Sequence, residues 1–436
     1  MDATVQIMGA NTIAMSRVRG GTGLLFLASA FPKAGVEVSG IPVPLMMIPL
    51  VIGLLLLSTP QQAPWSIDVA LLLLLVLSCI VATRVAFASS GLKEPIALLG
   101  WLMLPLAIVA ITVVRRVDGR RVVTALLGGV RLAVAFGYLQ LFFGVKQVAV
   151  PGITQTVGTD LDDKYLWIFV DGEVAFWKIP STYQNGNNFG VVVAVCFAIA
   201  LSHRKLYRSE RFQLLDLTLF ASAILLAGSR SVLLAWASAV AVLFVTPGIL
   251  DRMTRIRLLV VLATAAVATV AFQPGLLDRF SFSSITDATG AGRTAAWGDL
   301  FSEMRLSEWV FGSVRWGGAT DLSAVRDGVT EGWGGIVQQV GFVGLVLVLI
   351  VWLRYVWPVR AGLAVIAPLA VSMVLDSAYL AYPTLFLPAA FIAGLRLFDN
   401  SDGPLPALGS HGWVRYYPPR TSPRPFQIKR WRKAPD

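Results

Sequence analysis

The feature that most constrains this chain is a series of apolar runs, each long enough to cross a lipid bilayer. Hydrophobic residues make up 56% of the 436 residues and charged residues only 14%, whereas soluble globular chains carry about 25% charged residues. A membrane-spanning helix needs roughly 20 mainly apolar residues, and about twelve segments meet that requirement. They cover residues 20–34, 42–58, 66–88, 96–114, 122–143, 187–202, 212–228, 231–246, 256–273, 334–353, 359–376 and 380–396. The sequence therefore predicts an all-α, polytopic integral membrane protein and excludes a disordered chain.

The charged residues are distributed unevenly among the segments that join these spans. If the N-terminus is cytoplasmic, the cytoplasmic segments sum to +16, the outer segments to −4 and the spans to −1, which accounts for the net charge of +11. An excess of Lys and Arg marks the cytoplasmic side of membrane proteins. We therefore expect both termini to be cytoplasmic, with a membrane domain at 1–396 and a mostly disordered, basic, Pro-rich tail at 397–436 that contacts anionic headgroups or simply sets the topology.

Two loops on the predicted outer face are long, at about 144–186 and 274–333, and both are net acidic. Loops of this length are usually either functional or disordered, and their tryptophan content argues against disorder. A tryptophan at a membrane surface is commonly an interface anchor, while its flat ring also stacks on sugars. Both interpretations stay open for the two tryptophans that we select as candidate glycan-binding residues, Trp297 and Trp333.

Charged residues inside spans are costly, so they are informative. Arg131 lies about ten residues into the span at 122–143, a depth near the middle of the bilayer. One interpretation is a structural ion pair with a buried carboxylate such as Asp216. The other is contact with a ligand phosphate.

Arginine is also the only basic residue type in the outer loop at 274–333, which contains no lysine. Its guanidinium binds phosphate oxygens in a bidentate manner and keeps its charge. Some of these arginines are expected to pair with carboxylates, and at least one is expected to bind a diphosphate. Arg230 is the sharpest candidate, because it lies between two apolar runs among the small residues at 227–231, and Arg293 and Arg315 are the further candidates in the loop.

Two further positions at the outer ends of spans have polar side chains suited to chemistry or binding. Glu331 precedes the span at 334–353, where a dry environment raises a carboxyl pKa and suits a general base; a solvated loop carboxylate is the simpler alternative. Asn185 and Asn187 precede the span at 187–202. They are either a helix cap or amides that hydrogen-bond to sugar hydroxyls.

Five segments, taken in order, resemble the O-antigen ligase and polymerase superfamily. The segment 181–190 resembles the Asn-Pro-Asn segment that opens a span in that family, and 226–231 resembles its Ser-Arg motif. The segment 292–297 is similar to the Arg and Trp stretch at the start of the family's large periplasmic loop, and 311–312 is similar to the Phe-Gly that follows. Finally, 331–344 resembles the end of that loop and the start of the next span.

The resemblance implies a metal-independent glycosyltransferase without cofactors, located in the bacterial cytoplasmic (inner) membrane with its active site on the extracytoplasmic face. Its partners would be a polyprenyl-diphosphate-linked glycan donor, a glycan or lipid acceptor, membrane lipids and other envelope polysaccharide assembly proteins, and not nucleic acid. Arg230 and Arg293 would hold the diphosphate. Ligases of the family carry a His near the end of the large loop, whereas this chain has none there. The resemblance therefore leaves Glu331, and next Asp327, as candidate bases, and it favours a polymerase or a ligase with a carboxylate base.

Two other classes of protein compete with a transferase. A lipid-linked glycan flippase or another 12-span transporter would also explain the number of spans and the buried Arg131, but the two halves of the chain show no repeat of the kind common in transporters. A non-catalytic envelope scaffold would explain the tail but not the outer arginines. No phosphate-binding loop, dinucleotide fingerprint or serine-hydrolase motif is present.

Overall fold

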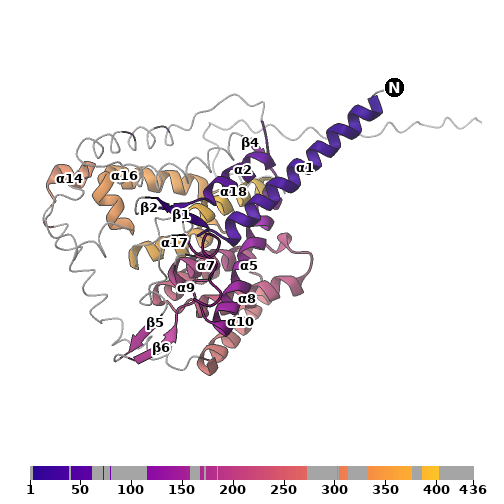
Figure 1. The fold of residues 1–436 in the computed structure, drawn as a ribbon. Helices are drawn as coiled ribbons and strands as arrows, with labels where there is room; N and C mark the ends of the chain where they lie inside the picture. The colour runs from indigo at the N-terminus through magenta and orange to yellow at the C-terminus, as the bar shows by residue number, and fades with distance from the viewer. Residues whose placement is uncertain are drawn as a thin grey trace, which may run out of the picture. The chain divides into compact units, whose positions relative to one another are not determined.

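The computed structural model describes residues 3–38, 41–60, 115–157, 167–170, 173–183, 185–272, 304–312, 332–375 and 385–401, with isolated positions at 72, 79 and 302. The helices of this part are α1 (Ala3–Ala30), α2 (Met47–Leu57), α5 (Gly119–Phe143), α7 (Gly186–Ser202), the 3-10 helix η1 (Arg204–Leu206), α8 (Glu210–Leu226), α9 (Arg230–Val245), α10 (Arg252–Phe272), α14 (Leu306–Phe311), α16 (Gly332–Val356), α17 (Gly362–Leu375) and α18 (Phe386–Ser401) (Figure 1).

The strands of the described part form antiparallel pairs of two strands each. They are β1 (Gly35–Val38) with β2 (Ile41–Pro44), β3 (Ser58–Pro60) with β4 (Arg115–Val117), and β5 (Trp167–Val170) with β6 (Glu173–Trp177). The described part is thus mostly helical, which confirms the expected all-α class.

Helices occur where the apolar runs predict them. Every predicted span except 66–88 and 96–114, which lie almost entirely outside the described residues, contains a described helix. Prolines account for one difference: the predicted span at 42–58 begins as strand β2, because Pro42 and Pro44 lack the N–H that a helix needs, while Pro49 is tolerated in the first turn of α2.

One helix in the described part, α5, is long and apolar enough by length and composition to cross a membrane. Several shorter helices are also apolar, including α7 and α17. The long α16 is interrupted at Gly341, so its apolar portion is shorter than its full length. The described part is therefore a helical chain that contains one candidate membrane span, and the number of spans stays a prediction.

The packing centre of the described part is α7. Each residue from Asn188 to Ser202 is buried, and α7 contacts α5, α8, α9 and α17, among which it lies in Figure 1. Its side chains are mainly Val, Ala, Ile and Phe, so neighbouring helices approach it on every side. A helix that is apolar all round is one buried in the centre of a bundle.

The helix ends form two groups: the C-terminal ends of α1 and α5 lie with the N-terminal end of α7, and the C-terminal end of α7 lies with that of α18. The C-terminal ends of α1 and α5 contact the segment before α7, since Thr182 Oγ1 donates to Ala30 O (2.6 Å) and Gln140 Nε2 donates to Ser181 O (3.0 Å). At the other end of α7, His203 Nε2 lies 3.6 Å from Asp399 Oδ1 of α18.

The interruption of α16 is caused by a close approach of α14. Gly341 has φ 67°, and a Cβ placed on it would lie 2.3 Å from Val310 O and 2.6 Å from Gly312 N. Next to this contact, the rings of Trp309 and Phe342 stack with centroids 5.4 Å apart. The contact joins segment 311–312 to segment 331–344, which are distant in sequence.

We expect Gly341→Ala to lower the free energy of unfolding by about 2 kcal/mol or more, because it combines a left-handed φ with a steric clash. Thermal unfolding of the purified protein measures the change. Gly248→Ala is the matched control: Gly248 also has positive φ (75°), but a Cβ there meets no atom within 4 Å. Equal losses in the two variants would contradict a packing role for Gly341.

Candidate functional site

The turn between α8 and α9 places Arg230 at a helix N-terminus. Gly228, with φ 59°, provides the left-handed conformation that lets the chain reverse after α8, and Arg230 is the first residue of α9. The N-cap residue Ser229 does not cap the helix through its side chain, since its Oγ instead lies 2.9 Å from Ser231 Oγ. The first N–H groups of a helix have no acceptor within it, so this end of α9 suits an anion.

The start of α7 is formed by the Asn-rich segment. Asn185 has the extended conformation of an N-cap residue, and its Oδ1 accepts a hydrogen bond from Asn188 N (2.8 Å). The helix-cap interpretation of Asn185 is therefore confirmed. The glycan-binding role of Asn185 and Asn187 stays a prediction, and Asn187 lies half-buried in the first turn.

These two helix starts meet, although about 40 residues of chain separate them. A Cβ on Gly186 would lie 2.6 Å from Ala227 O, and a Cβ on Gly190 would lie 2.5 Å from a Val232 methyl group. Ile179 N also donates to Leu226 O (3.2 Å). The N-termini of α7 and α9, each the positive end of a helix dipole, thus lie together, and small residues make that approach possible.

The segment that leads into α7 is held firmly by α5 and α1. Ser181 N donates to Gln140 Oε1 (2.7 Å), Ser181 Oγ donates to Ala133 O (2.5 Å), and Tyr183 OH donates to Ser29 O (3.2 Å). The side chains of Ser181, Thr182 and Tyr183 are all buried. This anchoring fixes where the Asn-rich segment begins relative to the α8–α9 turn.

Asn188 is the residue of this junction that sequence reasoning did not select as a site residue. It is fully buried, and neither its Oδ1 nor its Nδ2 has a hydrogen-bond partner within the described part of the chain. Burying an unpaired amide costs free energy, so Asn188 is a costly polar position beside the junction. Its signal in the sequence is an Asn inside the first turn of an otherwise apolar helix.

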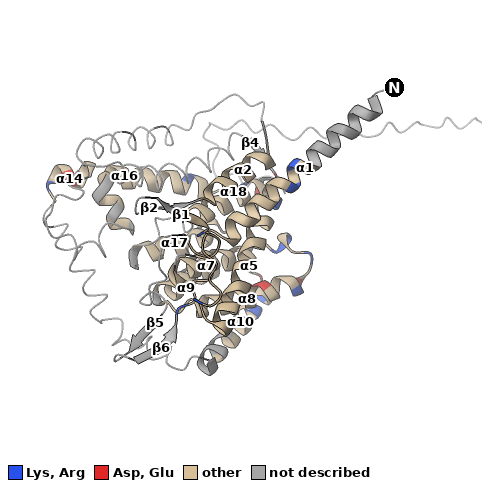
Figure 2. Ribbon diagram, in the orientation of Figure 1, with Lys and Arg blue, Asp and Glu red and all other residues tan. Residues whose placement is uncertain are grey.

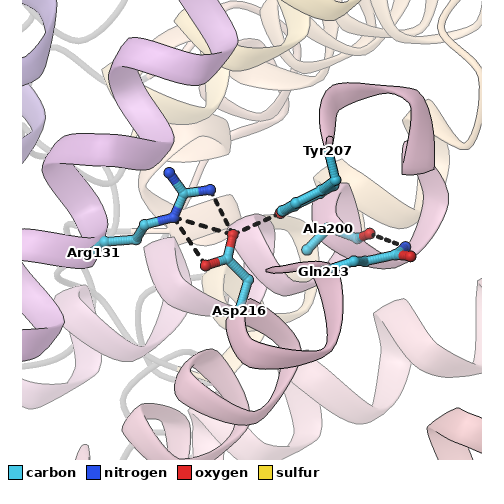
Figure 3. A network of polar contacts seen from close by, with 5 residues as sticks. All are labelled: Arg131, Ala200, Tyr207, Gln213 and Asp216. Atoms are coloured by element: carbon cyan, nitrogen blue, oxygen red, sulfur yellow. Dashed lines mark hydrogen bonds and ion pairs between the residues drawn. The ribbon is translucent and has the colours of Figure 1, made fainter. Parts of the chain in front are cut away.

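A second polar group joins α5, η1 and α8 (Figure 3). Arg131 Nε donates to Asp216 Oδ1 (2.9 Å), and Arg131 Nη2 lies 2.6 Å from Asp216 Oδ2. Tyr207 OH donates to the same Oδ2 (2.8 Å). The Asp216 side chain is 6% exposed and that of Arg131 is 39% exposed. The structural ion pair proposed for Arg131 is therefore confirmed, while its diphosphate-binding role stays a prediction.

Tyr207, which follows η1, and Gln213, in the first turn of α8, lie beside this ion pair. Burial raises the pKa of Tyr207, and the negative charge of Asp216 raises it further, so Tyr207 stays a hydrogen-bond donor. Gln213 Nε2 donates to Ala200 O (2.8 Å), which links α8 to α7 beside the pair (Figure 3). Sequence reasoning selected neither residue, because a single Tyr or Gln near a helix end gives no distinctive signal.

Of the remaining predicted site residues, two lie within the described part of the chain and the others lie outside it. Trp333 is half-buried, and its Nε1 donates to Ala370 O of α17 (2.9 Å), so part of its role is to join α16 to α17; glycan binding stays a prediction for it. The backbone of Arg230 is described but its side chain is not. The residues that lie outside the described part are Arg293, Arg315, Trp297, Asp327 and Glu331.

Two arrangements stand out among the described residues, a meeting of two helix N-termini and a buried ion pair. The first is the junction of the α7 and α9 N-termini, which includes Arg230; the second, Arg131 with Asp216, lies on α5 and α8. Comparison of the chain with protein family models and with characterised proteins found no match.

Proposed function

We propose that this protein is a polytopic membrane glycosyltransferase that transfers or polymerises a polyprenyl-diphosphate-linked oligosaccharide on the outer face of the bacterial cytoplasmic membrane. The observation that carries the proposal is the meeting of the α7 and α9 N-termini at Arg230. In this proposal, the positive ends of α7 and α9 together with the charge of Arg230 outweigh the C-terminal carbonyl groups of α8, which ends at the same junction. Such a site suits a diphosphate.

Membrane embedding is supported by the outward faces of the helices. On α16, the exposed residues include Phe342, Val346, Leu349, Ile350 and Leu353, which recur at helical spacing along one face. On α10, several apolar residues are likewise more than half exposed. Apolar faces of this extent are unfavourable in water, and they suit contact with lipid.

The grouping of helix ends supports the orientation. The junction at Arg230 lies with the ends of α1 and α5 that the charge distribution predicts to be outside, while His203 and Asp399 lie at ends predicted to be cytoplasmic. In the proposed topology, the anion site therefore opens toward the outer face, where lipid-linked glycans are joined.

The proposed reaction is a glycosyl transfer without metal or nucleotide. An acceptor hydroxyl oxygen attacks the anomeric carbon of the donor, the bond from that carbon to the diphosphate oxygen breaks, and the hydroxyl proton passes to a base. Negative charge grows on the departing diphosphate, so fixed positive groups stabilise the transition state more than the ground state. Glu331 and Asp327 are the candidate bases, and Arg230, Arg293, Arg315 and Arg131 are the candidate cations.

The test is an assay of the purified protein with a polyprenyl-diphosphate-linked oligosaccharide and an acceptor glycan. We expect longer glycans, or glycans joined to the acceptor, together with released polyprenyl diphosphate. Glu331→Gln and Asp327→Asn test the two candidate bases in turn, because the variant that lacks the base is expected to lose glycosyl transfer. Movement of the lipid-linked donor across a vesicle membrane without any new glycosidic bond would contradict the proposal and favour a flippase.

A further inference from the structure

A cavity of about 570 Å³ lies between α1 and α5, well separated along the chain from the junction at Arg230. Its charged lining residues are Arg19 and Arg121, and its apolar lining includes Gly23, Phe26 and Ala125. Ligand-binding pockets are typically a few hundred to about a thousand Å³, so the volume is large enough for a headgroup and the first part of an acyl chain.

The cavity lies where the close contact between α1 and α5 gives way to open space. At Gly129, a Cβ would lie 2.2 Å from Phe26 O and 2.8 Å from Ala30 N, so the two backbones are in direct contact there. Nearer their N-terminal ends, a Cβ on Gly23 would meet no atom within 4 Å. The cavity is therefore the open side of a wedge between two helices.

The charged groups among the described lining residues of this cavity are two arginines, with no Asp or Glu beside them in that lining. Arg121 pairs with Asp118, but both side chains of that pair are about half exposed, a setting in which ion pairs are weak. The hydroxyls of Thr22 and Thr124 donate to their own helix backbones, to Val18 O (2.8 Å) and Arg120 O (2.8 Å). The two arginines are thus the groups that select a ligand.

We propose that this cavity binds an anionic phospholipid, with the phosphodiester headgroup between Arg19 and Arg121 and an acyl chain against Gly23, Phe26 and Ala125. This proposal rests on the membrane embedding proposed above, and it does not depend on any glycosyl transfer. In the expected topology, Arg19 precedes the predicted span at 20–34 and Arg121 lies in the first turn of α5, so both are on the cytoplasmic side, where basic residues attract anionic headgroups. Figure 2 shows the basic band in α1 where its described side chains begin.

Charge and shape together favour a lipid over a free anion. Inorganic phosphate would use only the arginine end and leave the apolar wall exposed, whereas a phospholipid covers both. A zwitterionic phospholipid covers the wall but adds a positive group beside two arginines. The arrangement therefore predicts a preference for a net negative headgroup joined to a hydrocarbon chain.

The experiment titrates phosphatidylglycerol into the delipidated, detergent-solubilised full chain and counts bound lipid by native mass spectrometry, with no glycan donor present. We expect phosphatidylglycerol to bind more tightly than phosphatidylcholine. The double variant Arg19→Gln/Arg121→Gln is expected to lose roughly 30-fold in affinity for phosphatidylglycerol, which is the effect of two basic residues near an anionic lipid surface. The matched control is Arg120→Gln/Arg255→Gln, which removes two exposed arginines outside the cavity and is expected to bind as the wild type does.

A second variant fills the apolar part while keeping both arginines. Gly23→Leu fills the open space between the two helices and is expected to weaken phosphatidylglycerol binding about tenfold or more. Its control is Gly20→Leu, because a Cβ on Gly20 meets only Leu56, at 4.0 Å. The proposal would be overturned if phosphatidylcholine bound as tightly as phosphatidylglycerol. It would also be overturned if Arg19→Gln/Arg121→Gln bound phosphatidylglycerol as the wild type does. Displacement of the lipid by millimolar inorganic phosphate would also overturn it, since the site would then be one for a free anion. Lipid binding and transferase activity are separate measurements, so either proposal can fail alone.

Discussion

Arg230→Ala is expected to lower the rate of glycosyl transfer by about 10²- to 10³-fold, the usual loss when one preorganised group that stabilises transition-state charge is removed. Arg230 begins α9 at the point where α9 meets the start of α7. We expect the loss mainly in kcat, because negative charge develops on the diphosphate only as the glycosidic bond breaks. Steady-state kinetics with the lipid-linked donor measure both kcat and KM.

Two further variants sharpen this prediction. Arg230→Lys keeps the charge but loses the bidentate fork, so it is expected to recover only part of the activity. Arg252→Ala is the matched control, since Arg252 is likewise the first residue of a helix, α10, but is exposed and remote along the chain from the junction. Equal activity in Arg230→Ala and Arg252→Ala would contradict the proposed anion site, even if the protein proves to be a transferase.

Arg131→Met is expected to lower the free energy of unfolding by about 3 kcal/mol, because it leaves the Asp216 carboxylate buried without its cation. The carboxylate is 6% exposed, and Tyr207 alone would then donate to it among its described partners. Thermal or denaturant unfolding of the purified protein measures the change.

The ion pair can be separated from a general effect of losing an arginine. Arg204→Met is the matched control, because the Arg204 side chain is 60% exposed in its pair with Glu210, and exposed pairs contribute less than about 1 kcal/mol. The double variant Arg131→Met/Asp216→Leu should recover stability relative to Arg131→Met, since it removes the unpaired charge. Equal losses in Arg131→Met and Arg204→Met would contradict a buried structural pair.

Hydropathy predicted the described helices well, because a long apolar run in this chain has few alternatives to a helix. Helix α1 begins at Ala3, ahead of the predicted span at 20–34, and α14 lies in a predicted loop. Two other differences occur at prolines and at a contact between distant segments. Strand β2 replaces the start of one predicted span at Pro42 and Pro44, and α16 is interrupted where α14 packs against Gly341. The start of β2 could be predicted from the sequence, because proline lacks the N–H that a helix needs. The interruption of α16 could not, because it depends on a segment distant in sequence.

The candidate site was only partly predictable. Arg131 and Asp216 were paired as one of two alternatives, since an intramembrane charge needs a partner, and the N-cap role of Asn185 follows from residue type and position. Tyr207 as a second donor to Asp216, and Gln140 as the group that holds Ser181, required the fold. Their side chains are ordinary in sequence, and their roles depend on which helices lie next to one another.

The sequence by itself determined that the chain is helical and strongly apolar, since backbone groups among apolar side chains are best satisfied within a helix. It also determined which charged residues are costly enough to need partners. The tertiary structure decided that the Asn-rich start of α7 meets the Arg230 turn, that the buried amide of Asn188 lies at that junction, and that α1 and α5 diverge around Arg19 and Arg121. These features depend on close approach at Gly186, Gly190 and Gly129, and local sequence cannot specify which distant backbone will come to fill the space beside a glycine.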